Sequence, residues 1–418
     1  MSFLISHPSV APFVQQAARA LHEAGQLDRF ITSLRYDPHS PRQRLACRAA
    51  RVVGIDLESQ LRRRSVTELP AEKVESHPWG EAVRLLSGRL EHSGRLTDAI
   101  WARTEPAFDR MVARRLRREH TGVYGFEYCS LATFERAREL GVPAAYDMPA
   151  PEPRFVQGIL DREIAGFPEL RTPYHRYTAA REEKRIARRR AEWNAASLVI
   201  AASQFTRQSF AGAGLPVERV RIVPYGAPVP LPAAEAIGGG SREGAPLRLL
   251  WAGTFGVRKG AHYLLEAWRR GNFGQHATLR VFGSVALPDR LLQPSPAGVH
   301  FGGAVSRAEL MQEYRQADAL IFPTLCDGFG MVATEAWSCG TPVLTTDRAG
   351  VADLLRPGHN GRIFAAADAA AIGAALSWCL SHRRELRAMR EAAYSTAANW
   401  QWSDYRRGLV EALREIAP

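Results

Sequence analysis

The sequence is poor in lysine and cysteine and contains no long hydrophobic run. Among its 418 residues are 52 arginines but three lysines, Lys73, Lys184 and Lys259. The five cysteines form no CxxC pair and are too sparse for a disulfide scaffold, which favours a reducing compartment. No stretch approaches the roughly 20 apolar residues of a transmembrane helix, and the first residues lack the pattern of a secretory signal. We therefore expect a cytoplasmic protein, with any membrane contact peripheral and at the inner face of the cell membrane.

Positive charge is present in excess and is unevenly distributed. The formal net charge is +12, and residues 1–230 contain 35 Lys and Arg against 26 Asp and Glu, an excess of +9. Such an excess suits an anionic partner, whether nucleic acid, a membrane surface or a phosphorylated substrate. No recognised nucleic-acid-binding module or aromatic stacking platform accompanies the charge, which disfavours a nucleic-acid binder. With 46% hydrophobic and 23% charged residues, the composition excludes a disordered chain or a coiled coil.

Short apolar segments alternate with helical patterns along most of the chain. The series opens with a strand at residues 2–6, a helix from Pro12 to Gly25 and a strand at residues 29–34. An opening of this β-α-β kind predicts an α/β fold with a doubly wound parallel sheet. Residues 38–118 are rich in arginine and helical in tendency, without clear boundaries. The later elements of the first half are expected as strands at 122–126, 142–148 and 197–203 and helices at 130–140 and 181–193, with Ser203 as the N-cap of a further helix.

A Pro- and Gly-rich segment divides the chain. Residues 228–246 contain three consecutive glycines and few bulky apolar residues, which is typical of a flexible linker. We place the first domain at residues 1–227 and the second at 247–395, with a C-terminal helix at 396–418 that packs back on the first domain. Two doubly wound, Rossmann-like domains of this kind face each other across a central cleft. The second domain is expected to have strands at 247–253, 277–283, 319–324 and 341–346 and helices at 261–270, at 307–315 and from Met331.

The densest group of candidate site residues lies in PTLCDGFGMVATEAWSCGTPV, which begins at residue 323. Gly328 and Gly330 flank Phe329 between a strand and a helix, so backbone N–H groups could bind an anion near the helix N-terminus. Asp327 and Glu335 are eight residues apart, about 12 Å of rise along a helix. Two carboxylates that act on one glycosidic bond lie closer together, about 5 to 9.5 Å. They are therefore expected to contact different ends of one elongated ligand. The alternative is a helix N-cap for the first and a solvated helix position for the second.

A second candidate is WAGTFGVRKGAHYLLEAW, which begins at residue 251. Arg258 and Lys259 are adjacent in a glycine-bounded loop between a strand and a helix. Together they could neutralise a diphosphate, the arginine through its bidentate fork and the lysine as a point charge. The alternative is a solvated surface loop, because an RKG tripeptide alone is weak evidence.

Together these motifs resemble the retaining nucleotide-sugar glycosyltransferases of family 4, which have the two-domain GT-B fold. That family shows a KG loop after a strand, a GFG turn before a helix with an EA dipeptide, and a strand that starts with G-x-PV. The likeness covers residues 247–376, and the first half matches more loosely through RIVPYGAPV before the linker. The matching segments are, in order, VRKGAHYLLEAW, FGGAVSRAELMQEYRQADALIFPT, DGFGMVATEAWSCGTPV and AGVADLLRPGHNGRIF.

The resemblance implies a sugar donor held mainly by the second domain. Carried over by position, Lys259 with Arg258 would hold the diphosphate, Glu335 the ribose hydroxyls and Asp327 the donor sugar. Fixed cations and amide dipoles would stabilise the charge that builds on the leaving diphosphate. The other donor-site positions would be Gly328, Phe329, Gly330 and Met331 at the turn, Gly283, Ala304 and Val305 at the base pocket, and Thr254.

The sequence departs from the family pattern in several places. Asp327 stands where members usually carry glutamate, and Thr254 where many carry arginine, so that Arg258 would compensate. The glycine-rich loop after the first strand is replaced by SHPSVAP, and the histidine in the middle of the family's first domain has no counterpart near residues 124–129. No DxD motif occurs, which disfavours a metal held by paired carboxylates. We expect no metal and no cofactor, with the sugar donor as co-substrate.

His7 and Glu127 are the candidates for an acceptor-side catalytic residue. Each follows an expected strand of the first domain, where a cleft-facing residue would lie, and Asp147 has a similar place. The alternative for the histidine is a packing or helix-capping role. No G-x-S-x-G elbow surrounds Ser203, and no neighbouring histidine activates Cys339, so neither is expected to be a nucleophile.

The sequence thus predicts a metal-independent, retaining glycosyltransferase. It would move a hexose from a UDP- or GDP-sugar to a saccharide or lipid-linked saccharide in polysaccharide or glycoconjugate biosynthesis. Its basic first domain would meet an anionic membrane or a polyprenyl-diphosphate-linked saccharide, and not nucleic acid. The main alternative is a non-catalytic partner or scaffold subunit of the same fold. An epimerase or phosphorylase would need another acid–base set or a cofactor lysine.

Overall fold

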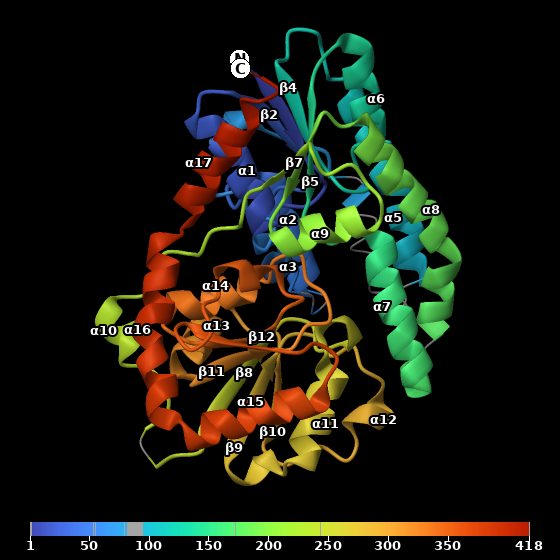
Figure 1. Cartoon of the computed structure of the whole chain (residues 1–418). Coiled ribbons are helices and arrows are strands. Elements are labelled where there is room, and N and C mark those ends of the chain that lie inside the picture. Colours follow the sequence, from blue (N-terminus) through green and yellow to red (C-terminus); the bar gives the residue numbers. More distant parts are fainter. Residues whose placement is uncertain are drawn as a thin grey trace.

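Two parallel β-sheets, each covered by helices, make up most of the molecule (Figure 1). This computed structural model describes residues 2–52, 54, 56–78, 80–81, 95–171, 173–242 and 244–417. The first sheet lies in the upper part of Figure 1 and the second in the lower part. The predicted fold class, two doubly wound α/β domains, is confirmed by the strand order of both sheets.

In the described part of the chain, the first sheet has seven parallel strands in the order β3-β2-β1-β4-β5-β6-β7. Its central strands are buried because helices cover both faces, as a parallel sheet requires. The strands are β1 Phe3–Ser6, β2 Leu27–Thr32, β3 Val74–Ser76, β4 Gly122–Phe126, β5 Ala144–Met148, β6 Leu198–Ala201 and β7 Val220–Ile222. The helices are α1 Pro12–Glu23, α2 Pro41–Val52, α3 Leu57–Arg62, α5 Arg95–Ala113, α6 Leu131–Leu140, α7 Pro153–Gly166, α8 Pro173–Ala195 and α9 Gln204–Gly212.

The second sheet, over the residues described, has six parallel strands in the order β10-β9-β8-β11-β12-β13. The strands are β8 Leu247–Ala252, β9 Ala277–Phe282, β10 Val299–Gly303, β11 Ala319–Phe322, β12 Val343–Thr346 and β13 Gly361–Phe364. The helices from here to the end of the chain are α11 Ala261–Arg270, α12 Asp289–Leu292, α13 Arg307–Gln316, α14 Met331–Ser338, α15 Ala369–Ser381, α16 Arg383–Asn399 and α17 Trp402–Leu413. The expected elements of both halves are present, most of them within a few residues of their expected bounds, whereas α8 begins at Pro173, eight residues before the expected Arg181.

Residues 38–118 contain one strand that the sequence did not indicate. The edge strand β3 pairs with β2, and its three residues, Val74–Ser76, include a single apolar side chain. A strand this short has no period of alternation to detect. The arginine-rich helical tendency corresponds to α2, α3 and α5, while residues 82–94 lie outside the described part of the chain.

The segment 228–246, which the sequence predicts to be a flexible linker, packs against the second domain over its described residues. It contains a short helix, α10 (Ala233–Ile237), and its backbone is held by side chains of the second domain. Arg390 of α16, itself buried, donates from Nε and Nη2 to the carbonyl of Ala236 at 3.1 and 2.8 Å. Ser241 donates from its N and Oγ to Asp318 at 2.8 and 2.7 Å. These hydrogen bonds hold the backbone of the segment in one conformation, although its prolines and glycines would allow others.

Helix α7 joins the first domain to the second, beside α8 in Figure 1. Glu163 Oε2 on α7 lies 3.0 Å from His262 Nε2 on α11, and both side chains are buried. Ile159 on the same helix packs against Leu325 and Cys326 of the second domain. A helix that belongs to the first domain by sequence thus contributes to the core between the two.

The last helix returns to the first domain. Figure 1 shows α16 along the second domain and α17 continuing upward beside α1. Arg406 on α17 donates from Nε to Glu23 and from Nη1 to Gln16 on α1, each at 2.6 Å. Helix α17 is therefore fixed to the first domain.

All five cysteines are buried and form no disulfide. Among the helices that the structure describes, none combines the length and the apolar character needed to cross a bilayer.

Candidate functional site

The candidate residues lie where the strand order of each sheet reverses. In the second sheet the chain runs outward from β8 through β9 to β10 and resumes on the other side of β8 with β11. Lys259 follows β8 and Asp327 follows β11. In the first sheet β1 and β4 flank the reversal, and they are followed by His7 and Glu127. Crevices outside the carboxyl ends of strands at such points are the usual ligand sites of open α/β sheets.

Lys259 and Asp327 form an ion pair that joins the two loops of the second domain. The lysine ends a short 3₁₀ helix, Val257–Lys259, and Gly260 follows with a φ of 74°. A side chain at this glycine would overlap the carbonyl oxygen of Pro323. Glycine therefore allows the two loops to touch, and the two sequence motifs form one cluster.

Arg258 is fixed beside this ion pair. Its Nη1 donates to the carbonyl of Cys326 at 2.9 Å, and its own carbonyl accepts from the N–H of Leu325 at 2.9 Å. Burial, and then the charge of Arg258, lower the pKa of Lys259 well below its ordinary value. With two cations and one carboxylate, the loops suit a ligand with more than one negative charge.

The glycine-rich turn presents the N-terminus of α14. Gly330 occupies the N-cap position and no side chain caps the helix, so that the N–H groups of Met331 and Val332 are available to an anion, whereas that of Ala333 donates to the carbonyl of Gly330 at 2.9 Å. The N–H of Phe329 is engaged, because it donates to Asp327 Oδ1 at 3.2 Å. Of the amides expected to meet a donor sugar, this one is already bound in the structure.

The same turn is fixed against the first domain. The carbonyl of Gly328 accepts from Ser203 Oγ at 2.6 Å and from Thr206 Oγ1 at 3.1 Å. A side chain at this glycine would overlap the carbonyl oxygen of Pro149, at the end of β5. Ser203 is also the N-cap of α9, as predicted, because its Oγ accepts from the N–H of Thr206. One hydroxyl thus serves a helix and the interdomain contact.

Glu335 is held inside the protein and not solvated on the surface of α14. The hydroxyl of Tyr314 donates to Oε2 at 3.1 Å, and Arg307 Nη1 lies 3.6 Å from Oε1. Burial raises the pKa of Glu335, and the charge of Arg307 and the hydrogen bond from Tyr314 oppose this rise. The carboxylate therefore has a fixed orientation before any ligand binds.

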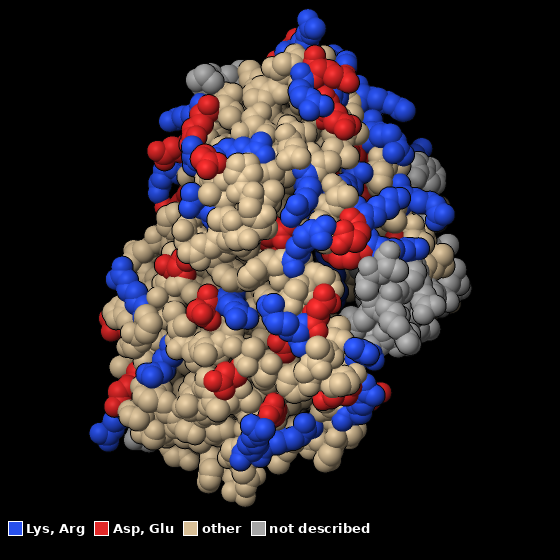
Figure 2. All heavy atoms as spheres, turned by 45° about the vertical axis from the view of Figure 1, so that its right-hand side comes forward, with Lys and Arg blue, Asp and Glu red and all other residues tan. Residues whose placement is uncertain are grey.

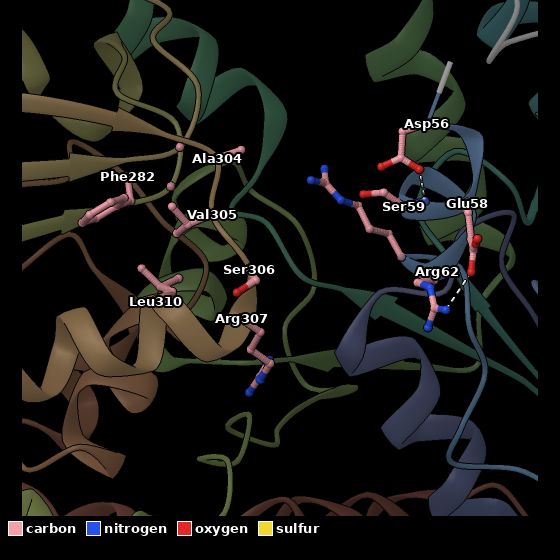
Figure 3. A pocket seen from close by; sticks show the side chains of 13 residues that line it. Asp56, Glu58, Ser59, Arg62, Phe282, Ala304, Val305, Ser306, Arg307 and Leu310 are labelled. Atoms are coloured by element: carbon pink, nitrogen blue, oxygen red, sulfur yellow. Dashed lines mark hydrogen bonds and ion pairs between the residues drawn. The ribbon is translucent and has the colours of Figure 1, made fainter. Parts of the chain in front are cut away.

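The three positions expected at the base pocket lie in one cavity of about 800 Å³ between the domains (Figure 3). The wall from the second domain includes Gly283, Ala304 and Val305, and α3 forms the opposite wall. Thr254 adjoins the lining residue Gly253, and its Oγ1 lies 3.2 Å from Ser284 Oγ. The lining is completed by Asp56, Glu58, Ser59, Arg62 and Arg63 of the first domain and by Phe282, Ser306, Arg307 and Leu310 of the second.

A second interdomain cavity, of about 540 Å³, contains Glu335 and Met331. Its other wall comes from α1 and α17 and includes Gln16, Trp402 and Arg406. Arg307 lines both cavities, whereas Lys259 and Asp327 line neither. The structure thus groups the expected donor residues into three adjoining sets and not into a single pocket.

His7 packs at the end of β1. Its Nδ1 accepts from the N–H of Ser9 at 2.9 Å, and its ring meets Phe126 edge-on at 5.0 Å. Burial lowers the pKa of His7 to about 4. The imidazole is therefore neutral at physiological pH.

Glu127 follows β4 and is engaged by an arginine. Its carboxylate is paired with Arg189 of α8, and both side chains are largely buried. The next residue, Tyr128, has a φ of 71°, and the guanidinium carbons of Arg185 and Arg189 lie 4.8 and 4.7 Å from its ring centre. An acceptor role for Glu127 stays a prediction, and it would require exchange of this ion pair.

Asp147 is enclosed in the first domain. Tyr124 donates its hydroxyl to Oδ2 at 2.6 Å, and the hydroxyl of Tyr225 lies 3.5 Å from Oδ1. Burial raises the pKa of Asp147 to about 7. With an exposed fraction of 1%, this carboxyl does not face a ligand cavity.

Sequence reasoning missed Arg307, Tyr314 and the α3 wall. Arg307 opens an expected helix, but only the packing of α13 beside α14 brings it to Glu335. The signal available for α3 was the run of three arginines at residues 62–64, within the arginine-rich segment. In the part of the chain that the structure describes, no group of three or more His, Cys, Asp or Glu side chains is arranged to hold a metal ion.

Known proteins resemble this chain in sequence and in fold. Residues 246–382 match the family model described as glycosyl transferases group 1. The structure of Anabaena HepE in complex with UDP is similar over 99% of each chain, with a TM-score of 0.60 and 15% identity. Sucrose-phosphate synthase from Thermosynechococcus elongatus is similar over 99% of this chain and 98% of its own, with a TM-score of 0.63 and 17% identity. The chain has the GT-B glycosyltransferase fold.

Structural similarity to HepE extends over 99% of this chain, whereas the family model matches residues 246–382. The D-inositol 3-phosphate glycosyltransferase of Nocardia farcinica is 37% identical over 103 residues. The matched segment is 25% of this chain and 23% of that relative. The loops that hold Lys259, Asp327 and Glu335 lie inside the range matched by the family model.

Proposed function

We propose that this protein is a glycosyltransferase that moves a sugar from a nucleoside diphosphate to an acceptor bound by the first domain. The observation that carries the proposal is the meeting of the two loops at the reversal of the second sheet. It brings Arg258, Lys259 and the N-terminus of α14 together, and the partly buried carboxylate of Glu335 lies about one turn further along that helix. Two cations and open amide groups suit a diphosphate, and a fixed carboxylate suits ribose hydroxyls.

The donor is a UDP- or GDP-sugar in this proposal. HepE has been solved with UDP and with UDP-glucose, which supports a uridine nucleotide as the first choice to test. The larger cavity, bounded by Gly283, Ala304 and Val305, would hold the base. Arg307, between the two cavities, would lie beside the ribose and keep Glu335 ionised.

The reaction we propose retains the configuration of the sugar and needs no metal. The bond between the anomeric carbon and the diphosphate oxygen breaks, the acceptor oxygen bonds to that carbon on the same face, and the acceptor proton passes to the leaving phosphate oxygen. Lys259, Arg258 and the α14 amides would stabilise the charge that develops on the diphosphate. His7, which is neutral, would line the sugar site as a hydrogen-bond donor.

The acceptor in this proposal is a saccharide or a lipid-linked saccharide. Figure 2 shows cationic side chains spread over the first domain and interspersed with acidic ones. The excess of +9 in residues 1–230 supports an anionic acceptor or an anionic membrane beside it. Both the class of acceptor and the membrane contact are proposals.

The proposal is tested with Lys259→Ala. The variant is expected to lose donor turnover and to bind the free nucleoside diphosphate at least about tenfold more weakly, since a charged hydrogen bond contributes about 1.5–3 kcal/mol. The matched control is Lys184→Ala, which removes an exposed lysine on α8. A thermal-shift screen with UDP, GDP, ADP and their sugars would first identify the nucleotide. Equal turnover in both variants would remove Lys259 from the diphosphate site.

A non-catalytic partner or scaffold subunit is the second candidate. It is favoured by the engagement of both oxygens of Asp327, one by Lys259 and one by the N–H of Phe329. Such a protein would bind the nucleotide and neither transfer nor hydrolyse the sugar. Release of free sugar from the donor by purified wild-type protein, absent in Lys259→Ala, would exclude this candidate.

A further inference from the structure

Helix α2 carries an exposed apolar stripe on the first domain. Among the described residues, three large apolar side chains are more than two-thirds exposed, and two of them, Leu45 at 69% and Val52 at 87%, are on this helix. Ala49 lies between them and is also exposed. Positions i, i+4 and i+7 share one helix face, so these three side chains form a single line along the outer surface.

The opposite face of α2 is the one that holds the helix in place. Cys47 is buried against Tyr36 and Leu61 in a small cluster of its own. Gln43 donates from Nε2 to the carbonyl of Arg35 and accepts from the N–H of Asp37, each at 2.9 Å. The outer stripe therefore has no part in the fold of the helix.

Arginines flank the stripe on both sides, and the helix contains no acidic residue. At 100° per residue, Arg42 falls on one side of the line and Arg44, Arg48 and Arg51 on the other. Arg51 is paired with Glu58 at 3.1 Å, whereas the other three make no side-chain ion pair with any residue that the structure describes. All four side chains are exposed.

We propose that α2 lies on an anionic phospholipid surface, with Leu45, Ala49 and Val52 inserted between the headgroups. Arginines on both sides of an apolar line can bury their stems and reach phosphates with their guanidinium groups, which is how interfacial helices bind. A 12-residue helix is about 18 Å long, too small to supply the roughly 800 Å² per partner of a stable protein interface. A bilayer makes no such demand, and its negative surface complements the four cations.

This contact would place the cleft beside the membrane. Glu58 on α3 pairs with both Arg51 and Arg62, so α2 and α3 are linked, and α3 forms one wall of the larger cavity. The consequence for catalysis rests on the proposed function: a lipid-linked acceptor could keep its chain in the bilayer while its sugar end reaches the cleft. The membrane contact itself requires neither donor nor acceptor.

The experiment is co-sedimentation of the full chain with vesicles of phosphatidylglycerol or of phosphatidylcholine. Wild type is expected to bind the anionic vesicles at low salt and to be released at high salt. Leu45→Gln/Val52→Gln is expected to bind on the order of tenfold more weakly. Ile363→Gln, which changes an exposed apolar residue of the second domain, is the matched control and is expected to bind like wild type.

The charge contribution is tested with a second pair of variants. Arg44→Gln/Arg48→Gln is compared with Arg384→Gln/Arg414→Gln, which removes two exposed arginines from α16 and from the end of α17. Weaker binding by the first pair alone supports the proposal. Equal weakening of vesicle binding by both pairs would mean that binding depends only on the net charge of the protein, and this would overturn the proposal.

Two further outcomes would also overturn the assignment. If wild type does not sediment with phosphatidylglycerol vesicles, α2 is not a membrane surface. If Leu45→Gln/Val52→Gln converts a dimer into a monomer in light scattering and leaves vesicle binding unchanged, the stripe joins two copies of the chain. Lys259→Ala should bind vesicles like wild type, so that failure of the proposed function and failure of this contact are told apart.

Discussion

Glu335 shows how one buried side chain can prepare a binding site. Its carboxylate is already oriented by Tyr314 and Arg307, so a ligand hydroxyl would meet a fixed acceptor. We predict that Glu335→Gln weakens binding of the nucleoside diphosphate by roughly 10- to 100-fold, because a hydrogen bond to a charged group contributes about 1.5–3 kcal/mol. Titration calorimetry measures the change.

The matched control for this prediction is Glu391→Gln, which makes the same replacement at an exposed position of α16. It should bind the nucleotide like wild type. Equal affinities for wild type and Glu335→Gln would place the ribose elsewhere.

Asp147 gives a second prediction at the scale of a residue. Its native pKa of about 7 lies above the ordinary 3.8, so the native state holds this proton more tightly than the unfolded chain. The stability that the protonated carboxyl contributes is fully present below pH 3.8 and is lost as pH rises through about 7. Asp147→Asn keeps the shape and removes the titration. Its stability relative to wild type should therefore rise between pH 5 and pH 8, by a few kcal/mol in order of magnitude.

Urea unfolding of both proteins at the two pH values measures this difference. Other groups titrate equally in wild type and variant, so the comparison isolates Asp147. Parallel pH profiles would show that Tyr124 and Tyr225 hold the carboxyl ionised.

The sequence identifies some of these site residues and gives no signal for others. Asp327, Glu335 and Lys259 stand in short motifs beside strand ends, so their types and spacing carry the signal. The ion pair between Lys259 and Asp327 could not be predicted, because it depends on two loops 68 residues apart meeting at a reversal of strand order. Arg307 and Tyr314 carry no motif and acquire a place only through packing of α13 on α14.

Helix α9 gives a prediction at the scale of an element. Ser203 caps this helix and also donates to the carbonyl of Gly328 in the other domain. Ser203→Ala should lower the free energy of unfolding by about 2 kcal/mol, roughly 1 for the cap and 1 for the buried hydrogen bond. The measurement is denaturant unfolding without ligand.

The control for the cap is Ser306→Ala. Ser306 caps α13 but, unlike Ser203, donates no hydrogen bond to any described residue of the other domain. It should cost about 1 kcal/mol. Equal losses in the two variants would mean that the hydrogen bond to Gly328 contributes nothing.

Helices and strands with a regular spacing of apolar residues could be predicted from the sequence. Segments whose structure depends on contacts with distant residues could not. The strand at residues 122–126 and the helix at residues 261–270 were predicted at their observed bounds because apolar spacing and terminal glycines mark them. The edge strand β3 has no such pattern. The glycines of residues 228–246 suggested a flexible backbone. Hydrogen bonds with Arg390 and Asp318, which lie much later in the sequence, hold that segment in place.

The contact between α7 and α11 gives a prediction for the whole molecule. His262→Ala removes the buried imidazole beside the Glu163 carboxylate, and losing one buried hydrogen-bond partner in this way costs about 1–3 kcal/mol. His276→Ala, at an exposed position of the same domain, should change stability by less than about 0.5 kcal/mol. Thermal unfolding measures the stability of the two variants. Equal melting temperatures would show that the contact between α7 and α11 does not stabilise the protein.

The return of α17 to α1 also has a consequence for how the protein is made. Arg406 on α17 contacts a face of α1 that precedes the whole second domain in the sequence. The first domain therefore leaves the ribosome with that face of α1 exposed. The face stays exposed until the second domain and α17 have been synthesised. During that interval this face of α1 lacks the contacts of α17, so the first domain completes its packing only after the second domain has been translated.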